Sequence, residues 1–428
     1  MRSLISWLAG AALLFRIALA PAHAADGDCA TLPPTPLALA AADDLVSRCN
    51  RDVIAARHAM IAAEADLRVA SQRPNPNLTL GASNVNPHVG IGSGPLRDKT
   101  FDSSVRLDQL VERGGKGELR EAQARGLVAA ARADIAEQVR TQRLAMRTSF
   151  FDLAAAQERV RLQLEFRDLA LQSAGASNER LQAGDVSRAE ANRFRLDAAR
   201  AANDARQAEA DRERARLDLA KLLGTESSAP ELEVRIEWPD QEPPAAAPGE
   251  RPDVAAAHRR LDAALAGRAL ARSIATRDLT FAAQADRWPV SETNIQGTGI
   301  SYTLSVSVPL HVRHANEGEA ARGQADFDSA QAQAQRAEAS AGAEGRAAAM
   351  DWRSARERRE RVEREVRPLA HDVAEAAEFA YRHGATGVLD LLDARRSLKA
   401  VELDEVQSLA ESSKAWARLS AARETLAE

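Results

Sequence analysis

Two stretches of this sequence repeat one another at an offset of 201 residues, which pairs Asp52 with Asp253. "NRDVIAARHAMIAA" occupies 50–63 and "ERPDVAAAHRRLDAAL" occupies 250–265. Three further pairs follow in the same order at an offset of 200 or 201: "ASQRPNPNLTLGAS" (70–83) with "ARSIATRDLTFAAQ" (271–284), "DQLVERGGK" (108–116) with "VPLHVRHAN" (308–316), and "AGDVSRAEANRFR" (183–195) with "HGATGVLDLLDAR" (383–395). A constant spacing indicates an internal duplication, whereas two helices of similar composition would match only locally.

The composition favours long helices and gives no sign of an enzyme. The 428 residues fit two units of about 200. The net charge of −5, with both signs interspersed, argues against a nucleic-acid partner. Aromatic residues make up only 4%, and long Ala-rich stretches contain few helix breakers. There is no phosphate-binding loop, nucleophile elbow or zinc framework, so we expect no catalytic site and no cofactor.

The amino terminus predicts export. Arg2, the apolar stretch "LISWLAGAALLF" and the "AHA" that ends at Ala24 together form a signal-peptide pattern, and cleavage is expected after residue 24. The exported chain would enter an oxidising compartment, where Cys29 and Cys49 can pair. We expect a Cys29–Cys49 disulfide, with two unpaired thiols as the alternative.

Four segments alternate between apolar and polar residues, as half-buried strands do. They form two hairpins, at about 77–110 and about 278–310, and the cleanest alternation is "SYTLSVSVPL". Each strand is about 9–11 residues long, which crosses a bilayer core when tilted. The expected organisation is a signal peptide (1–24), a first repeat (25–228), a Pro-rich connector (229–250) and a second repeat (251–428).

The helices between the hairpins are unusually long. Residues 40–72 are predicted to form one helix that ends at "RPNPN". Residues 112–171 contain no proline and predict a helix of roughly 90 Å. Breaks are expected at "SAGASN" and "LQAGD" in the first repeat, and between about 368 and 387 in the second.

Four strands cannot close a barrel, and an open edge cannot lie in lipid because its backbone groups would be unpaired. Three copies would supply 12 strands, an even number that closed barrels use. We therefore expect a mainly α-helical fold with a pair of membrane β-hairpins, trimeric, with a 12-stranded barrel continuing into a helical barrel. The alternative is that both hairpins form a small soluble sheet.

Several motifs make the mature chain resemble the TolC-like outer-membrane efflux proteins. They are "RPNPNL", "ERGGK", "RPDV" and, most specifically, "YRHGATGVLDLLDA" at 381–394. The resemblance implies a homotrimer in the outer membrane with a long periplasmic extension. It also implies a periplasmic adaptor and an inner-membrane pump, most often of the RND type, as partners. The expected function is the exit duct of a tripartite exporter, and the alternative is a periplasmic helical scaffold or adaptor.

The same resemblance implies a periplasmic gate at Tyr381, Asp390 and Asp393. The two aspartates are spaced i,i+3 and share a helix face; without the family they would be ordinary solvated acids. Thr386 stands where some members have an arginine, so an interprotomer link there would be absent. Both reversals, at Gly184 and Gly384, are the implied adaptor-docking tips.

The cargo is less well determined than the channel. "QRPNPNLTLGASN" and the opening of the second repeat resemble the cobalt-zinc-cadmium branch, which favours heavy-metal cations, with small toxic compounds as the alternative. His311 and His314 in "HVRH" lack a nearby carboxylate or cysteine to complete a metal site, so we expect solvated histidines and no bound metal.

Overall fold

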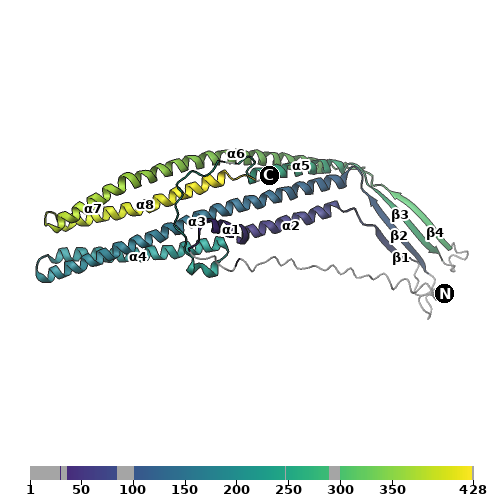
Figure 1. The fold of residues 1–428 in the computed structure, drawn as a ribbon. Helices are drawn as coiled ribbons and strands as arrows, with labels where there is room; N and C mark the ends of the chain where they lie inside the picture. Colours follow the sequence, from purple (N-terminus) through teal and green to yellow (C-terminus); the bar gives the residue numbers. More distant parts are fainter. Residues whose placement is uncertain (1–28, 30–35, 84–100, 246, 289–298, 427–428) are drawn as a thin grey trace, which may run out of the picture.

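The computed structural model describes residue 29, residues 36–83, residues 101–288 except 246, and residues 299–426. The predicted signal peptide lies outside these residues. The chain forms a long rod, with a four-stranded sheet at one end and helices that run away from it on one side (Figure 1). This confirms the predicted mainly helical fold with two antiparallel hairpins.

The two hairpins join into one antiparallel sheet. Its strands are β1 (Asn77–Ser83), β2 (Asp102–Val111), β3 (Leu279–Trp288) and β4 (Gly299–Ser307), in the order β1-β2-β3-β4. The central β2–β3 pairing is between repeats, so neither hairpin stands alone. The outer edges of β1 and β4 have no strand partner among the described residues.

The register gives the sheet one apolar and one polar face. Leu78, Leu107, Ala283 and Leu304 lie in one row across the four strands. The neighbouring row on the other face is polar, namely Thr79, Arg106, Gln284 and Thr303. The apolar face is strongly exposed on this single chain, since Leu304 is 85% exposed. Such a face requires lipid or another chain to cover it.

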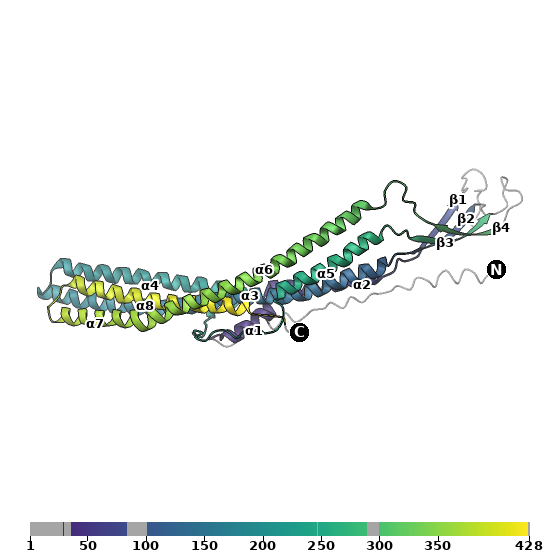
Figure 2. The ribbon, with the colours of Figure 1, turned by 90° about the horizontal axis from the view of Figure 1, so that it is seen from above.

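Helices from both repeats pack along one another. The longest is α3 (Lys116–Ala183), whose 68 residues span roughly 100 Å at the usual rise per residue. It contacts α2 (Arg51–Ser71) and α5 (Pro252–Ser273) toward the sheet, and α4 (Arg188–Leu223) and α8 (Val388–Ala422) toward the far end. The second repeat adds α6 (Glu317–Arg361) and α7 (Arg367–Arg382), and α6 runs alongside α5 (Figure 2).

Three predicted helix boundaries were wrong. The helix expected at 40–72 is split into α1 (Leu39–Cys49) and α2, because Asn50 is extended and its side-chain oxygen accepts hydrogen bonds from the N–H groups of Asp52 and Val53. The expected break at "SAGASN" does not occur, and α3 continues through it to Ala183. Packing of this segment against α4 outweighs the weak helix propensity of its Ser and Gly residues.

The third error lies at Pro368. The chain continues through it in helix, from a π-helical turn, η4 (Val362–Val366), into α7. Pro368 has no N–H to donate to the preceding turn, and the π-helical turn with its irregular hydrogen bonds lies directly before it. The reversal occurs only at 383–387.

The main core lies midway along the rod, where α1 meets α3 and α4. Phe150 and Phe151 are fully buried there, together with Val46, Leu219 and Leu223. A disulfide joins Cys29 to Cys49 at the end of α1. The connector between the repeats packs on the same core through a short 3-10 helix, η3 (Glu226–Glu231), and a parallel bridge between Leu37 and Val234.

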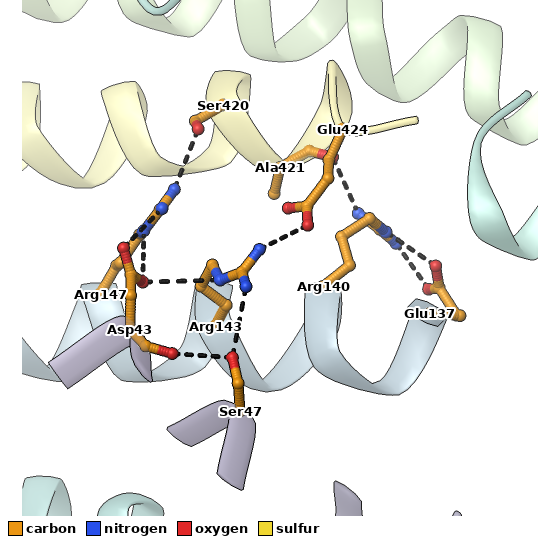
Figure 3. Close-up of polar contacts among 9 residues, drawn as sticks. All are labelled: Asp43, Ser47, Glu137, Arg140, Arg143, Arg147, Ser420, Ala421 and Glu424. Carbon is orange, nitrogen blue, oxygen red and sulfur yellow. Dashed lines mark hydrogen bonds and ion pairs between the residues drawn. The ribbon is translucent and has the colours of Figure 1, made fainter. Parts of the chain in front are cut away.

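Ion pairs beside this core tie the end of the second repeat to the first (Figure 3). Arg147 of α3 binds Asp43 of α1 at 2.8 Å and donates to Ser420 of α8. Arg143 reaches Glu424, just beyond α8, at 2.5 Å. Because these groups are largely buried, their mutual pairing offsets the cost of desolvation. Within the described part of the chain, no helix is both apolar and long enough to span a membrane.

Candidate functional site

The two helical hairpins end in turns built in the same way. At each turn a glycine has a positive φ, 86° at Gly184 and 71° at Gly384. The N–H of the next residue bonds a carbonyl five residues back, from Asp185 to Arg180 (2.9 Å) and from Ala385 to Ala380 (2.8 Å). Glycine permits this left-handed turn without strain. Both turns lie at the end of the rod farthest from the sheet (Figure 1).

Tyr381 joins the two hairpin tips. Its phenol donates a hydrogen bond to Oε1 of Glu190, in the first turn of α4, at 2.9 Å. Arg180, in the last turn of α3, donates to the same phenol oxygen at 3.2 Å. The ring of Tyr381 also packs edge-on against Phe194 of α4, with centroids 6.3 Å apart. Tyr381 therefore links both arms of the first hairpin to the second.

The environment keeps this phenol protonated. Partial burial raises the pKa of Tyr381, and the hydrogen bond to Glu190 raises the pKa further. Arg180 acts in the opposite direction but does not reverse the shift. At neutral pH the phenol is consequently the donor to Glu190.

Asp390 and Asp393 begin α8 on one exposed face. Their helix neighbours Val388, Leu391 and Leu392 are buried against Phe194, so the aspartates are directed away from the protomer core. Asp390 has no hydrogen bond or ion pair within the described ranges, and the carboxylate of Asp393 is 3.5 Å from Arg396. Both acids are thus available to another chain or to a passing ion.

The structure brings together only part of the predicted set. Tyr381 bonds with Arg180 and Glu190 and with neither aspartate. Glu190, the partner of Tyr381, is not among the residues that the sequence predicts for this site. The signal was present, because Ser187 followed by Glu190 marks the start of α4. Arg396, which also lies 3.5 Å from Asp197, was missed as well.

The histidines of "HVRH" lie at the other end of the molecule, between β4 and α6. Over the residues that the structure describes, no group of three or more His, Cys, Asp or Glu side chains is arranged to hold a metal ion. The site therefore consists of the two hairpin tips and the exposed carboxylates of Asp390 and Asp393. The hydrogen bonds of Tyr381 with Glu190 and Arg180, which we call the Tyr381 clasp, join the tips.

Comparison with known proteins finds a family model and a curated relative that each match part of the chain. Residues 244–423 match the family described as "Outer membrane efflux protein". A curated relative, the cobalt-zinc-cadmium resistance protein CzcC of Cupriavidus metallidurans, is 29% identical over 195 residues. That match covers 45% of this chain and 43% of the relative, so it spans less than half of the relative's length.

Solved structures share the fold over most of the chain. The CmeC outer membrane channel of Campylobacter jejuni has a TM-score of 0.77 at 16% identity, covering 90% of this chain and 85% of its own. A membrane protein from Pseudomonas aeruginosa has a TM-score of 0.77 at 18% identity, covering 90% of each chain. The family is one of channels and not of enzymes. Residues 244–423 thus match the outer membrane efflux protein family, and the chain shares the fold of solved outer membrane channels over 90% of its length.

Proposed function

We propose that this protein is the outer-membrane exit duct of a tripartite efflux system. The observation that carries the proposal is the two-faced sheet, with Leu78, Leu107 and Leu304 on one side and Thr79, Arg106 and Thr303 on the other. A strand with one face toward lipid and one toward an aqueous lumen requires this alternation. The helices would then carry the lumen into the periplasm.

The duct would be a homotrimer. The edges of β1 and β4 carry backbone groups that lipid cannot satisfy. Pairing β4 of one protomer with β1 of the next removes both edges, and three copies of four strands make a 12-stranded barrel. The exposed apolar face would then be covered by lipid and the polar face would line the pore.

The helical tips would form the gate and the docking site. Three protomers around one axis would place Asp390 and Asp393 in two stacked rings of carboxylates, which favour cations. The Tyr381 clasp would hold the tips of each protomer together. The turns at Gly184 and Gly384 would meet a periplasmic adaptor, which connects the duct to an inner-membrane pump, with the RND type as our proposal.

We propose heavy-metal cations as cargo, with small toxic compounds as the alternative. The support is the partial match to a cobalt-zinc-cadmium resistance protein together with the acidic tips. Growth of a deletion strain over divalent metals and over hydrophobic dyes separates the two. Sensitivity confined to cobalt, zinc or cadmium supports metals, and sensitivity confined to dyes removes the metal assignment.

Extraction and gel mobility test the duct itself. The duct requires detergent for release from membranes and should run on gels as a heat-sensitive trimer. A periplasmic scaffold with a soluble sheet would instead be released by osmotic shock, and this outcome would overturn the proposal.

A further inference from the structure

Each of the four connections between the sheet and the helices carries an exposed arginine. Arg73 precedes β1, Arg113 follows β2, Arg277 precedes β3 and Arg313 follows β4. None of the four guanidinium groups has an ion pair or hydrogen bond in the described parts of the chain. The duplication aligns Arg113 with Arg313, but Arg73 and Arg277 do not align with each other. A shared origin of the repeats therefore does not explain all four positions.

Backbone contacts hold three of these arginines at one level of the rod. The carbonyl of Pro74, next to Arg73, accepts a hydrogen bond from Gln109 at 3.0 Å. The N–H of Arg113 donates to Asp278, next to Arg277, at 2.9 Å. Three connections that are distant in sequence thus meet in one layer, where the helices join the sheet (Figure 1).

Two acidic side chains in this layer already have cationic partners. Asp278 binds Lys116 at 2.8 Å, and Glu112 binds Arg120 at 2.8 Å. Glu118 is unpaired among the described residues, but the four arginines outnumber it, so the layer carries excess positive charge. Surplus charge collected in one layer points to an anionic partner.

A groove of about 760 Å³ opens between two of the connections. Arg73 and Arg113 both line it, together with the partly exposed apolar side chains of Leu110 and Val111. Three glutamates also line the groove, of which Glu112 is paired with Arg120 and Glu121 with Arg125. The groove therefore combines two guanidinium groups that have no ion pair with an apolar margin and one unpaired carboxylate, Glu118. This is the chemistry of a phospholipid, whose phosphate lies beside its acyl chains.

The arginines also lie where the apolar face of the sheet ends. On the fourth strand the exposed apolar series continues beyond β4 through Leu310 and Val312, which is 82% exposed, and Arg313 follows at once. On the second strand Val111 is the last apolar residue before Arg113. Hydrocarbon thus gives way to charge directly after the apolar series on both strands, as at a membrane surface.

We propose that Arg73, Arg113, Arg277 and Arg313 form a belt that binds phospholipid headgroup phosphates in the leaflet nearer the helices. Arginine suits this role because its planar guanidinium binds phosphate oxygens in a bidentate manner. The groove beside Arg73 and Arg113 seats one headgroup. This inference rests on the proposed function, since it requires the sheet to lie in the membrane.

Native mass spectrometry of the full-length protein in detergent, titrated with phosphatidylglycerol, tests the belt. The variant is Arg73→Gln with Arg113→Gln. The matched control is Arg193→Gln with Arg206→Gln, which removes two exposed, unpaired arginines from α4, away from the sheet. We expect the junction variant to weaken the lipid Kd by about tenfold or more. The control should bind as the unmodified protein does.

Four results would overturn the belt. One is an unchanged lipid Kd in the junction variant. Another is equal weakening in both variants, which would indicate general attraction by charge. The third is loss of the trimer without a change in lipid binding, which would assign the arginines to subunit contacts. Competition by inorganic phosphate at equal concentration would assign the groove to a free anion, and this also contradicts the proposal.

The test separates this inference from the proposed function. If the unmodified protein is released by osmotic shock, the duct proposal fails together with the belt. If it is membrane-inserted and trimeric but the junction variant binds lipid normally, only the belt fails.

Discussion

The phenol of Tyr381 lies 2.9 Å from the carboxylate of Glu190, and this bond joins hairpin tips that are 191 residues apart in sequence. Apolar contacts of Phe194 with Val388, Leu391 and Leu392 also hold the tips together. Farther from the turns, Arg395 donates to Ser173 at 2.9 Å and Arg396 lies 3.5 Å from Asp197.

Removing this phenol should loosen the tips. In Tyr381→Phe the ring still packs on Phe194, but the hydrogen bond to a charged group is lost, at a cost of about 1.5–3 kcal/mol. Amide hydrogen exchange near Gly184 and Gly384 should then accelerate by about tenfold or more. Tyr302→Phe changes the other tyrosine, which lies exposed on β4, and should leave exchange at the tips unchanged. Equal exchange at the tips in Tyr381→Phe and the unmodified protein would show that the clasp contributes nothing.

The exposed acids at the start of α8 should control ion selectivity. Asp390→Asn with Asp393→Asn removes two negative charges per protomer, so the reversal potential in a KCl gradient should move toward zero. The control is Asp66→Asn with Asp218→Asn, which removes the same charge from α2 and α4. Unchanged selectivity in the tip variant would remove these residues from the gate.

Two glycines of α3 should respond to alanine in opposite directions. A Cβ on Gly126 would lie 2.9 Å from Cβ of Ala263 and 3.0 Å from its backbone, so Gly126→Ala forces α3 and α5 apart. We expect a loss of about 1–3 kcal/mol in unfolding free energy, as for other overpacked cores. Gly175 has no neighbour within 4 Å, so Gly175→Ala should gain up to about 1 kcal/mol through helix propensity. Thermal unfolding followed by circular dichroism measures both changes, and similar shifts for the two variants would contradict the α3–α5 packing.

The contact between α5 and α6 should weaken as the pH rises, because His258 then loses its proton. Its ring nitrogens lie 3.1 Å from Glu250 and 2.8 Å from Glu338. Partial burial lowers the pKa of His258, but the hydrogen bonds to Glu338 and Glu250 outweigh burial and the net pKa is raised. A raised folded-state pKa gives stability that is complete below the unfolded pKa, near 6.5, and is lost as pH rises through the folded value.

The expected contribution of this histidine is below about 1 kcal/mol because the pair is partly exposed. His258→Asn should flatten the dependence of the unfolding midpoint between about pH 6 and about pH 8. His58→Asn, one residue from the equivalent position of the first repeat, should not, since His58 is exposed and has no ion pair within the described residues. A pH dependence that survives His258→Asn would assign it to other groups.

Local sequence signals were enough to predict the strands and the turns at the hairpin tips. The alternation in "SYTLSVSVPL" identified β4 because each second residue faces the same environment. The glycines at 184 and 384 identified the tips because few other residues adopt that φ. These signals are local and need no knowledge of distant residues.

The remaining features depend on contacts distant in sequence. Asn50 interrupts the first helix in part because its side chain bonds Gln142 and the carbonyl of Leu222. The helix continues through Gly175 because α4 packs beside it. Glu190 is the partner of Tyr381 because the tips of the two helical hairpins pack together. Propensity alone predicts none of these, since each is decided by tertiary packing.

The central claim is that the sheet lies in a membrane with one face toward lipid and the other toward water. Leu304→Cys and Ser305→Cys place a probe on adjacent residues of β4 that face opposite sides of the sheet. The two native cysteines form a disulfide, so the introduced thiol is the only one to react with a bimane label. In outer membranes, the label at 304 should be quenched by a nitroxide lipid and the label at 305 by aqueous iodide. Strong quenching of both labels by iodide, with none by the lipid probe, would contradict a membrane sheet and leave a periplasmic protein.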